Sequence, residues 1–377
     1  MAGIYLHIPF CKQACYYCDF HFSTSLKHKT PLLEALAKEL VLRKNEIAEE
    51  IQTIYFGGGT PSILNRDEID FLLHIIVENY PVSASPEITL EANPDDLSKE
   101  KLIDLSKTKI NRLSIGIQSF FDEDLIYMNR AHSAKEAQES LKYAKQYFSN
   151  ITIDLIYGVP GLTHERWRDN IQKALDLGIP HLSCYALTVE DKTALAGFIQ
   201  SGKYQPLNEE LANEQFQLLC EILHREGYVH YEISNFGLPG YFSQHNSAYW
   251  KGVAYLGIGP SAHSYDGQKR SWNVSNNVKY IKALQEDTLP SEIEELSLTD
   301  KMNEKIMIGL RTIWGISLME FQHEFGKEKH DLLLKNASKY INDEVLILKP
   351  GALMIAEKGK FYVDGIASDL FFINEND

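Results

Sequence analysis

The sequence lacks any apolar run of the roughly 20 residues that a membrane-spanning helix needs. Its most apolar stretches, YLGIGPSAH and ITIDLIYGVPG, are short and are interrupted by Gly and Pro. Positive charge is also scarce, because 37 Lys and Arg residues stand against 52 Asp and Glu residues, for a formal net charge of -15. This balance disfavours the phosphate backbone of nucleic acid, and no basic patch offsets it. The sequence therefore predicts neither a membrane-spanning protein nor a nucleic-acid partner.

Signals for export are missing as well. The N-terminus has no charged segment followed by an apolar one, as a signal peptide would, and instead enters a strand-like run at once. Of only five cysteines, Cys11, Cys15 and Cys18 crowd together while Cys184 and Cys220 stand alone. This is not the even spacing of a secreted disulfide framework. We therefore expect reduced thiols and a cytoplasmic protein, with a peripheral association with the membrane left open.

The first half of the chain alternates short β-branched or aromatic runs with longer amphipathic segments. Such alternation is the pattern of repeated βα units. The runs predicted as strands are 4–8, 53–56, 88–92, 112–117, 151–157 and 181–187, and the segments predicted as helices are 31–50, 67–79, 99–108, 134–147 and 166–177. Six parallel strands with crossover helices predict an α/β fold, a partial TIM-like (β/α)6 barrel.

The pattern changes after the sixth run. A helix is expected over 209–226, and a stretch rich in Gly, Asn and aromatic residues follows it. Helices are then expected over 299–311, 318–325 and 329–342, followed by a hairpin over 345–348 and 352–355. Helices that precede a small hairpin suggest a winged-helix-like appendage. We expect a barrel over 1–235, a connecting region over 236–297 and a C-terminal helical domain over 298–377.

The three clustered cysteines, Cys11, Cys15 and Cys18, follow the first predicted strand directly. Three thiolates are one too few for a closed metal site, but on an iron-sulfur cube they leave one iron open. The amine and carboxylate of S-adenosylmethionine (SAM) can chelate that iron, which brings the sulfonium beside a low-potential cluster. The alternative is a zinc site that a histidine such as His7 or His21 completes. The unequal spacing favours a [4Fe-4S] cluster.

Polar or backbone-exposing residues recur where successive predicted strands end. Gly58, Gly59 and Thr60 follow the second strand, Glu91 is on the third, Gln118 follows the fourth and Asp154 is on the fifth. Ligands of βα barrels bind at the carboxyl ends of the strands, and glycines let a ligand approach the backbone closely. Each residue alone could be a turn, a cap or a salt-bridge partner. Together they predict a SAM site.

The chain resembles the coproporphyrinogen oxidase-like branch of the radical SAM superfamily, and within it the HemW-type haem chaperones. The resemblance covers nearly the whole chain and rests on YLHIPFC, CxxxCxYCDF, YFGGGTPS, EANPD, RLSIGIQSF, LIYMNRAH, IDLIYGVPG, YEISNF, HNSAYW and YLGIGPSAHS. It implies that the three cysteines bind the cluster. It also implies that SAM is contacted by Tyr5, Tyr17, Gly58, Gly59, Thr60, Glu91, Gln118, Arg130 and Asp154.

One departure separates the chain from the oxidases of that branch. The oxidases carry a further cysteine shortly after the third cluster ligand, whereas Asp19 and Phe20 follow Cys18 here, and we expect no N-terminal extension. The resemblance then implies haem binding, with the HNxxYW motif present as His245, Asn246, Tyr249 and Trp250. Imidazole is a common axial haem ligand, so His245 is the candidate and His263 the second one. A histidine that only hydrogen-bonds inside the protein is the alternative.

Three functions compete at this point. The first is a haem chaperone that docks on respiratory membrane proteins and delivers haem to them, as a monomer or a homodimer. The second is an oxygen-independent coproporphyrinogen III oxidase of porphyrin biosynthesis. The third is a zinc-stabilised binding module. We expect the first, so the protein would be a radical SAM protein without coproporphyrinogen dehydrogenase activity.

Overall fold

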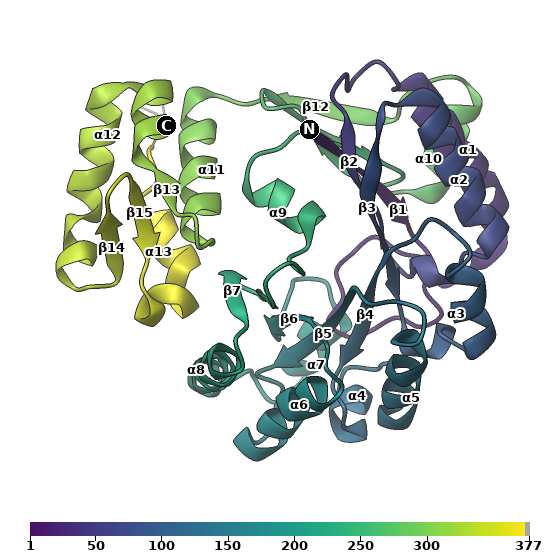
Figure 1. Cartoon of the computed structure of the whole chain (residues 1–377), viewed down its shortest axis with the longest axis horizontal. Coiled ribbons are helices and arrows are strands. Elements are labelled where there is room, and N and C mark those ends of the chain that lie inside the picture. The colour runs from purple at the N-terminus through teal and green to yellow at the C-terminus, as the bar shows by residue number, and fades with distance from the viewer. Residues whose placement is uncertain (374–377) are drawn as a thin grey trace.

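The computed structural model describes residues 1–373, so the last four residues of the predicted C-terminal domain lie outside the described part. Its main feature is a curved sheet of twelve strands in the order β12-β11-β10-β9-β1-β2-β3-β4-β5-β6-β8-β7 (Figure 1). The strands are β1 (Ala2–Ile8), β2 (Ile51–Gly58), β3 (Val82–Ala92), β4 (Arg112–Gln118), β5 (Ile151–Tyr157), β6 (His181–Ala186), β7 (Val229–Glu232), β8 (Asn235–Gly237), β9 (Tyr255–Ile258), β10 (His263–Tyr265), β11 (Lys269–Asn273) and β12 (Ser291–Glu295).

Strands β1 to β6 are parallel and form the predicted barrel wall, which confirms the six sequence runs. The residues of β1, β4 and β5 are buried almost without interruption, as expected where one face meets helices and the other lines the barrel interior. Because all six run in the same direction, their carboxyl ends meet at one rim. That rim is where the sequence predicts the ligand site.

Helices pack around the sheet, mostly on its outer face, whereas the short helix α9 (Gln244–Trp250) lies at the amino ends of the strands. They are α1 (Lys29–Leu42), α2 (Arg66–Asn79), α3 (Lys99–Leu105), α4 (Asp122–Tyr127), α5 (Ala134–Ala144), α6 (His164–Asp176), α7 (Ala194–Gln200), α8 (Glu209–Arg225), α9 (Gln244–Trp250) and α10 (Asn277–Gln285), with 3-10 turns η1 (Leu26–His28), η2 (Pro61–Ile63) and η3 (Pro94–Asp96). The helix predicted over 31–50 ends early, at Leu42. Arg43 turns inward there and donates to Glu39, Glu46 and the carbonyl of Gly257. The spacing of apolar residues alone predicts that this helix continues, whereas the buried ion pair of Arg43 with Glu39 lies where it ends.

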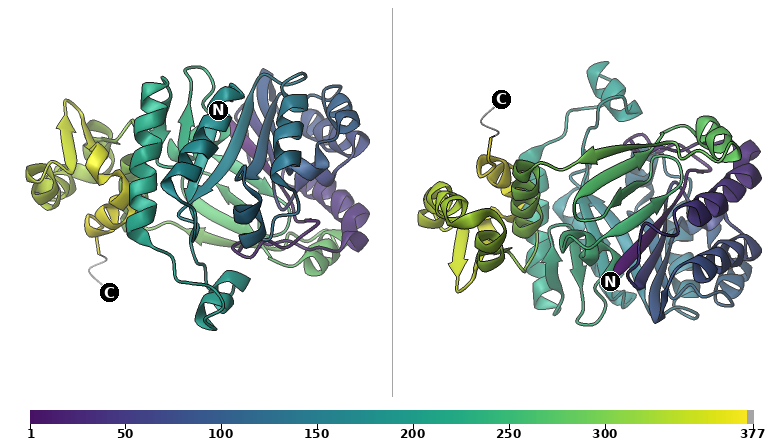
Figure 2. Two further views of the ribbon diagram at one scale, coloured as in Figure 1. Left: turned by 90° about the horizontal axis from the view of Figure 1, so that it is seen from below. Right: turned by 90° about the horizontal axis from the view of Figure 1, so that it is seen from above.

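The predicted connecting region 236–297 adds strands to the same sheet. In this region β9 runs parallel to β1, with Gly3 opposite Tyr255, and β10, β11 and β12 continue antiparallel. Figure 2 shows these strands beside the N-terminal strand. They extend the barrel wall on the β1 side, while β8 and β7 extend it on the β6 side.

The C-terminal domain has its own hydrophobic core and a three-stranded sheet in the order β13-β15-β14. Its elements are α11 (Leu298–Leu310), β13 (Ile316–Ser317), α12 (Leu318–Asn342), β14 (Leu346–Lys349), β15 (Ala352–Ile355), η4 (Glu357–Tyr362) and α13 (Val363–Asp369). A kink at Gly326, with φ 87° and ψ 164°, divides α12 into the two helices that the sequence predicts. The predicted hairpin is β14 with β15.

The C-terminal domain docks on the β7 edge of the large sheet, next to α8 (Figures 1 and 2). The backbone N–H of Ile233 donates to the carbonyl of Arg311 at 3.0 Å, and that of Ile313 donates to Tyr231 at 3.1 Å. These bonds pair the sheet edge, which would otherwise be exposed. Among residues 1–373, no helix combines the length and apolar character needed to cross a membrane.

Candidate radical SAM site

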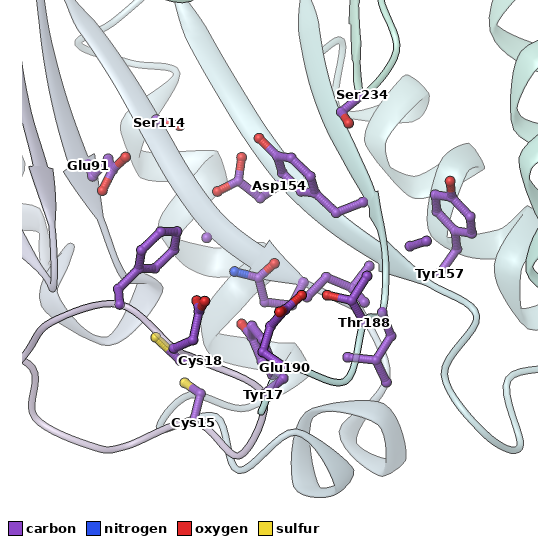
Figure 3. A pocket seen from close by; sticks show the side chains of 18 of the residues that line it. Cys15, Tyr17, Cys18, Glu91, Ser114, Asp154, Tyr157, Thr188, Glu190 and Ser234 are labelled. Atoms are coloured by element: carbon purple, nitrogen blue, oxygen red, sulfur yellow. The ribbon is translucent and has the colours of Figure 1, made fainter. Parts of the chain in front are cut away.

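A cavity of about 660 Å³ opens at the carboxyl ends of β1 to β6. Figure 3 shows Cys15, Tyr17 and Cys18 at one end of it, Asp154 in the middle, and Tyr157 and Ser234 towards the other end. The predicted site residues on its wall are Cys11, Cys15, Tyr17, Cys18, Gly58, Gly59, Thr60, Glu91, Gln118, Arg130 and Asp154. The fold thus gathers residues that are up to 143 positions apart in the chain, from Cys11 to Asp154, around one space.

The loop that carries the three cysteines is held by backbone contacts on both sides. Cys11 N–H donates to Ser23 at 3.1 Å and Tyr16 N–H donates to Met128 at 3.1 Å. Gly59, at the end of β2, lies against the same loop, where a Cβ would be 2.7 Å from the Phe10 carbonyl oxygen. Only glycine fits that approach.

Arg130 is the cation of the cysteine end. Its Nη1 donates to Cys15 Sγ at 3.3 Å, and its Nη2 donates to Asn93 Oδ1 at 2.6 Å and to the Gly116 carbonyl at 3.0 Å. Within the described chain its buried Nε has no partner. The guanidinium is therefore fixed beside the sulfur of Cys15, and its Nε–H donor is unused within residues 1–373. Sequence reasoning missed Asn93, although it follows Glu91 by two residues in the EANPD segment.

The cysteines fit an iron-sulfur cluster with three protein ligands. Burial raises the pKa of Cys11 and raises the pKa of Cys18 to about 11, so thiolates there require a neighbouring positive centre such as iron. Cys184 and Cys220 do not line the cavity, which leaves three thiols at it. Over residues 1–373, no three His, Cys, Asp or Glu side chains come close enough to hold a single metal ion. An iron-sulfur cube spreads its ligands over several metal atoms, so it does not need the three thiols gathered around one ion.

Two carboxyl groups lie in the floor of the cavity. Glu91 accepts from Tyr55 Oη at 2.8 Å and from Gly58 N–H at 3.2 Å. Burial raises the pKa of Glu91 to about 7 and the pKa of Asp154 to about 7 as well, the latter against the opposing effect of Arg130. Both groups therefore titrate near neutral pH. They suit a cationic ligand, and SAM carries a sulfonium.

Of the nine residues predicted to contact SAM, all but Tyr5 line the cavity. Gln118 ends β4 with φ 62°, a left-handed backbone conformation that is unusual for a side chain other than glycine or asparagine. Tyr5 instead packs below Gly57, and its hydroxyl lies 3.3 Å from His7 Nδ1. Contact between Tyr5 and SAM stays a prediction, and in the structure its side chain packs against the position of Gly57 and does not line the cavity.

His245 lies at the opposite end of the barrel. The short helix α9 occupies the amino ends of the strands, where Glu87 on β3 accepts from the backbone N–H groups of Gln244 and His245. The His245 ring is buried, with Nδ1 2.8 Å from Thr53 Oγ1 and Nε2 2.7 Å from Tyr249 Oη, and it stacks on Tyr55. Burial lowers the pKa of His245 to about 3. Its role as a haem ligand stays a prediction, and binding iron would replace one of these two hydrogen bonds.

His263, the second candidate for a haem ligand, lies on β10 with an exposed side chain. Its ring is tilted against Trp272 on β11, with the ring centroids 6.0 Å apart. It does not line the cavity. Neither candidate histidine is therefore on the wall that carries the cysteines.

Comparisons with known proteins agree with this geometry. The Radical SAM superfamily pattern matches residues 5–174, and the HemN C-terminal domain pattern matches residues 296–362. The chain is 36% identical to "Heme chaperone HemW" of Lactococcus lactis over 94% of this chain and 93% of that protein. It is 34% identical to the protein of that name from Bacillus subtilis, over 96% of each. A crystallised coproporphyrinogen III oxidase, HemN from Escherichia coli, superposes with a TM-score of 0.84 over 98% of this chain and 90% of that chain, at 23% identity, which shows a shared fold.

A parallel βα barrel with three cysteines on its first loop, facing a cavity lined by glycines and two carboxyl groups, defines a radical SAM protein. The second matched domain narrows the class to HemN-like members. The chain belongs to the HemW family, as its identity to curated members over nearly its whole length shows.

Proposed function

We propose that this protein is a haem chaperone that carries a [4Fe-4S] cluster on Cys11, Cys15 and Cys18 and binds SAM beside it. The observation that carries the proposal is the match to proteins named heme chaperone across both domains, together with the three thiols on one cavity wall. When bound, the cluster supplies low-potential electrons and SAM supplies a carbon-sulfur bond that such an electron can break.

The chain's own residues position and charge this site. Arg130 keeps a positive charge at Cys15, and burial of the adjacent groups strengthens that interaction. Gly58 and Gly59 expose backbone groups to the ligand, and Thr60 borders the same wall. When Glu91 and Asp154 are ionised, their carboxylates attract the sulfonium of SAM. We propose these residues as SAM contacts on the strength of their position at the cavity.

Delivery of haem to respiratory membrane proteins is the finer part of the proposal. We propose that the protein works in the cytoplasm and reaches its acceptors by docking, either as a monomer or as a homodimer. The support is the HemW family membership, while the acceptors and the oligomeric state stay predictions. Asp19 and Phe20 follow Cys18 in this chain, so the further cysteine of the oxidases is missing. Its absence supports haem carriage over coproporphyrinogen oxidation.

Anaerobic reconstitution tests this function. The protein with cluster and SAM is titrated with haem and, separately, incubated with coproporphyrinogen III and a reductant. We expect saturable haem binding with about one haem per chain, and no protoporphyrinogen or carbon dioxide. Formation of protoporphyrinogen would establish the oxidase instead. Absence of haem binding by the intact, cluster-loaded protein would contradict the chaperone function.

A further inference from the structure

The cavity continues well beyond the cysteine end, to the junction of the barrel and the C-terminal domain. Its wall there is formed by residues that the cluster and SAM predictions do not use: Phe216, Ile233, Arg311, Lys360, Phe361 and Val363. The first two come from α8 and the β7–β8 turn, and the others come from the C-terminal domain. A ligand at this end would contact both domains at once.

The middle of this wall is apolar and aromatic. The rings of Phe216 and Phe361 lie 5.7 Å apart at 52° and join the two domains. Ile233 packs against the cores of both domains. Aromatic and branched side chains of this kind suit the face of a flat apolar ring system.

Two cations border the apolar wall, and each has an unused donor. Lys360 is buried, with Nζ 3.0 Å from His230 Nδ1 and 2.7 Å from Glu357 Oε1. His230 Nε2 donates to the Ile233 carbonyl at 3.0 Å, so Nδ1 accepts from the ammonium, which keeps one of its three hydrogens free.

Arg311 is the other cation. It pairs with Asp364 and, at 3.6 Å, with Glu232, while its enclosed Nε has no partner within residues 1–373. The three carboxylates of Glu232, Glu357 and Asp364 outnumber the two cations, so charge alone does not make this end a strong binding site for anions. Because Arg311 Nε is enclosed, a carboxylate here would accept from the terminal Nη groups of Arg311 and from the Lys360 ammonium, with the apolar wall beside them.

We propose that this end of the cavity is a subsite for haem, with the macrocycle against Phe216 and Phe361 and its two propionates accepting from Arg311 and Lys360. A flat, apolar tetrapyrrole with two carboxylates on one edge matches an aromatic wall with two donors beside it. The inference rests on the proposed function, which it deepens by placing haem between the domains. His245 is not part of this subsite.

The ligand itself provides a test that needs no variant. Wild-type protein with its cluster is titrated with haem, with iron-free protoporphyrin IX and with protoporphyrin IX dimethyl ester, the latter two by porphyrin fluorescence. We expect the free acid to bind without iron and the ester to bind about tenfold or more weakly, because charge-assisted bonds to both propionates are lost. Equal affinity of ester and free acid would overturn the subsite. No binding of haem at all would instead overturn the proposed function.

Variants test the two cations. We expect Arg311→Gln and Lys360→Gln each to weaken binding of protoporphyrin IX about tenfold, and Arg311→Lys to restore part of it. Lys358→Gln is the matched control, because Lys358 is on the same 3-10 turn, is exposed and does not line the cavity. The cluster absorption of each variant reports an intact fold. Wild-type affinity in both Gln variants, with haem still bound, would contradict the subsite and leave the chaperone function standing.

Discussion

At the scale of single residues, Glu91 links the pH to SAM binding. A cationic ligand binds the ionised carboxylate, and the pKa of Glu91 is raised to about 7, so SAM affinity should increase as the pH rises through 7. Between pH 6 and pH 8 we expect a gain of about tenfold, measured by isothermal titration under anaerobic conditions. Glu91→Gln should lower the affinity at pH 8 about tenfold and reduce the pH dependence.

The control for this prediction is Glu34→Gln on α1, which removes an exposed carboxylate that does not line the cavity.

The raised pKa of Glu91 also predicts how the stability of the ligand-free protein changes with pH. A carboxyl whose pKa is higher in the folded state stabilises the fold at low pH, and this contribution is lost as the pH rises from about 4.5 to about 7. The ligand-free wild type should therefore lose roughly 1 kcal/mol from this group between pH 6 and pH 8. An unchanged pH profile of SAM affinity in Glu91→Gln would contradict this role.

His245 gives a second prediction at this scale. Replacing it with alanine leaves the hydroxyls of Thr53 and Tyr249 without their imidazole partner and opens a void beside Tyr55. We expect His245→Ala to lower the free energy of unfolding by roughly 2–4 kcal/mol, measured by denaturant titration. His263→Ala, at an exposed position, is the control and should change it little. Wild-type stability of His245→Ala would contradict the packing role.

The haem-ligand prediction is checked on the same variant. If His245 ligates iron, the absorption spectrum of bound haem changes in His245→Ala, and the brown cluster remains. If the haem spectrum and affinity stay as in wild type, the iron ligand lies elsewhere. The sequence places His245 in the HNxxYW motif with Tyr249 and Trp250, and in the structure Tyr249 and the distant Tyr55 hold the ring inside the barrel.

At the scale of elements, the end of β2 and the cysteine loop must approach closely. A Cβ on Gly59 would come within 2.9 Å of three backbone atoms of Ile8 and Phe10, none of which can rotate away. We expect Gly59→Ala to displace the loop and to lower the iron content after reconstitution by at least half, measured by iron and sulfide analysis. Gly365→Ala, in α13 with open space around it, should leave the iron content unchanged. Full iron loading of Gly59→Ala would show that the approach is not needed.

Elements with a strong local signal could be predicted from the sequence. The run 151–157 is a strand with the same bounds in the structure, because every residue of it is apolar or β-branched except Asp154. The boundary of α1 could not be predicted, since it depends on Arg43 reaching Gly257, which is distant in the chain. Helix α9 was missed because its seven residues are stabilised by Glu87 and by Ser243 rather than by their own periodicity.

At the scale of the whole molecule, the cavity belongs to two domains. The cysteine end was predictable, because most of its residues lie on the strands near their carboxyl ends or in the loops that follow, and parallel strands bring these ends together. The end of the cavity beside the C-terminal domain could not be predicted. Arg311 and Lys360 lie in that domain and reach the cavity only because the domain docks on the β7 edge. Nothing in their local sequence marks them as part of a site.

The most direct test of the central claim is electron paramagnetic resonance of the anaerobically reconstituted, reduced protein with and without SAM. The account predicts about four irons per chain and a spectrum that changes when SAM is added, because SAM binds the iron that lacks a thiolate. Cys15→Ser should abolish the signal. A spectrum that SAM leaves unchanged, or a protein that takes up zinc but no iron, would contradict a cluster held by Cys11, Cys15 and Cys18 with one open corner.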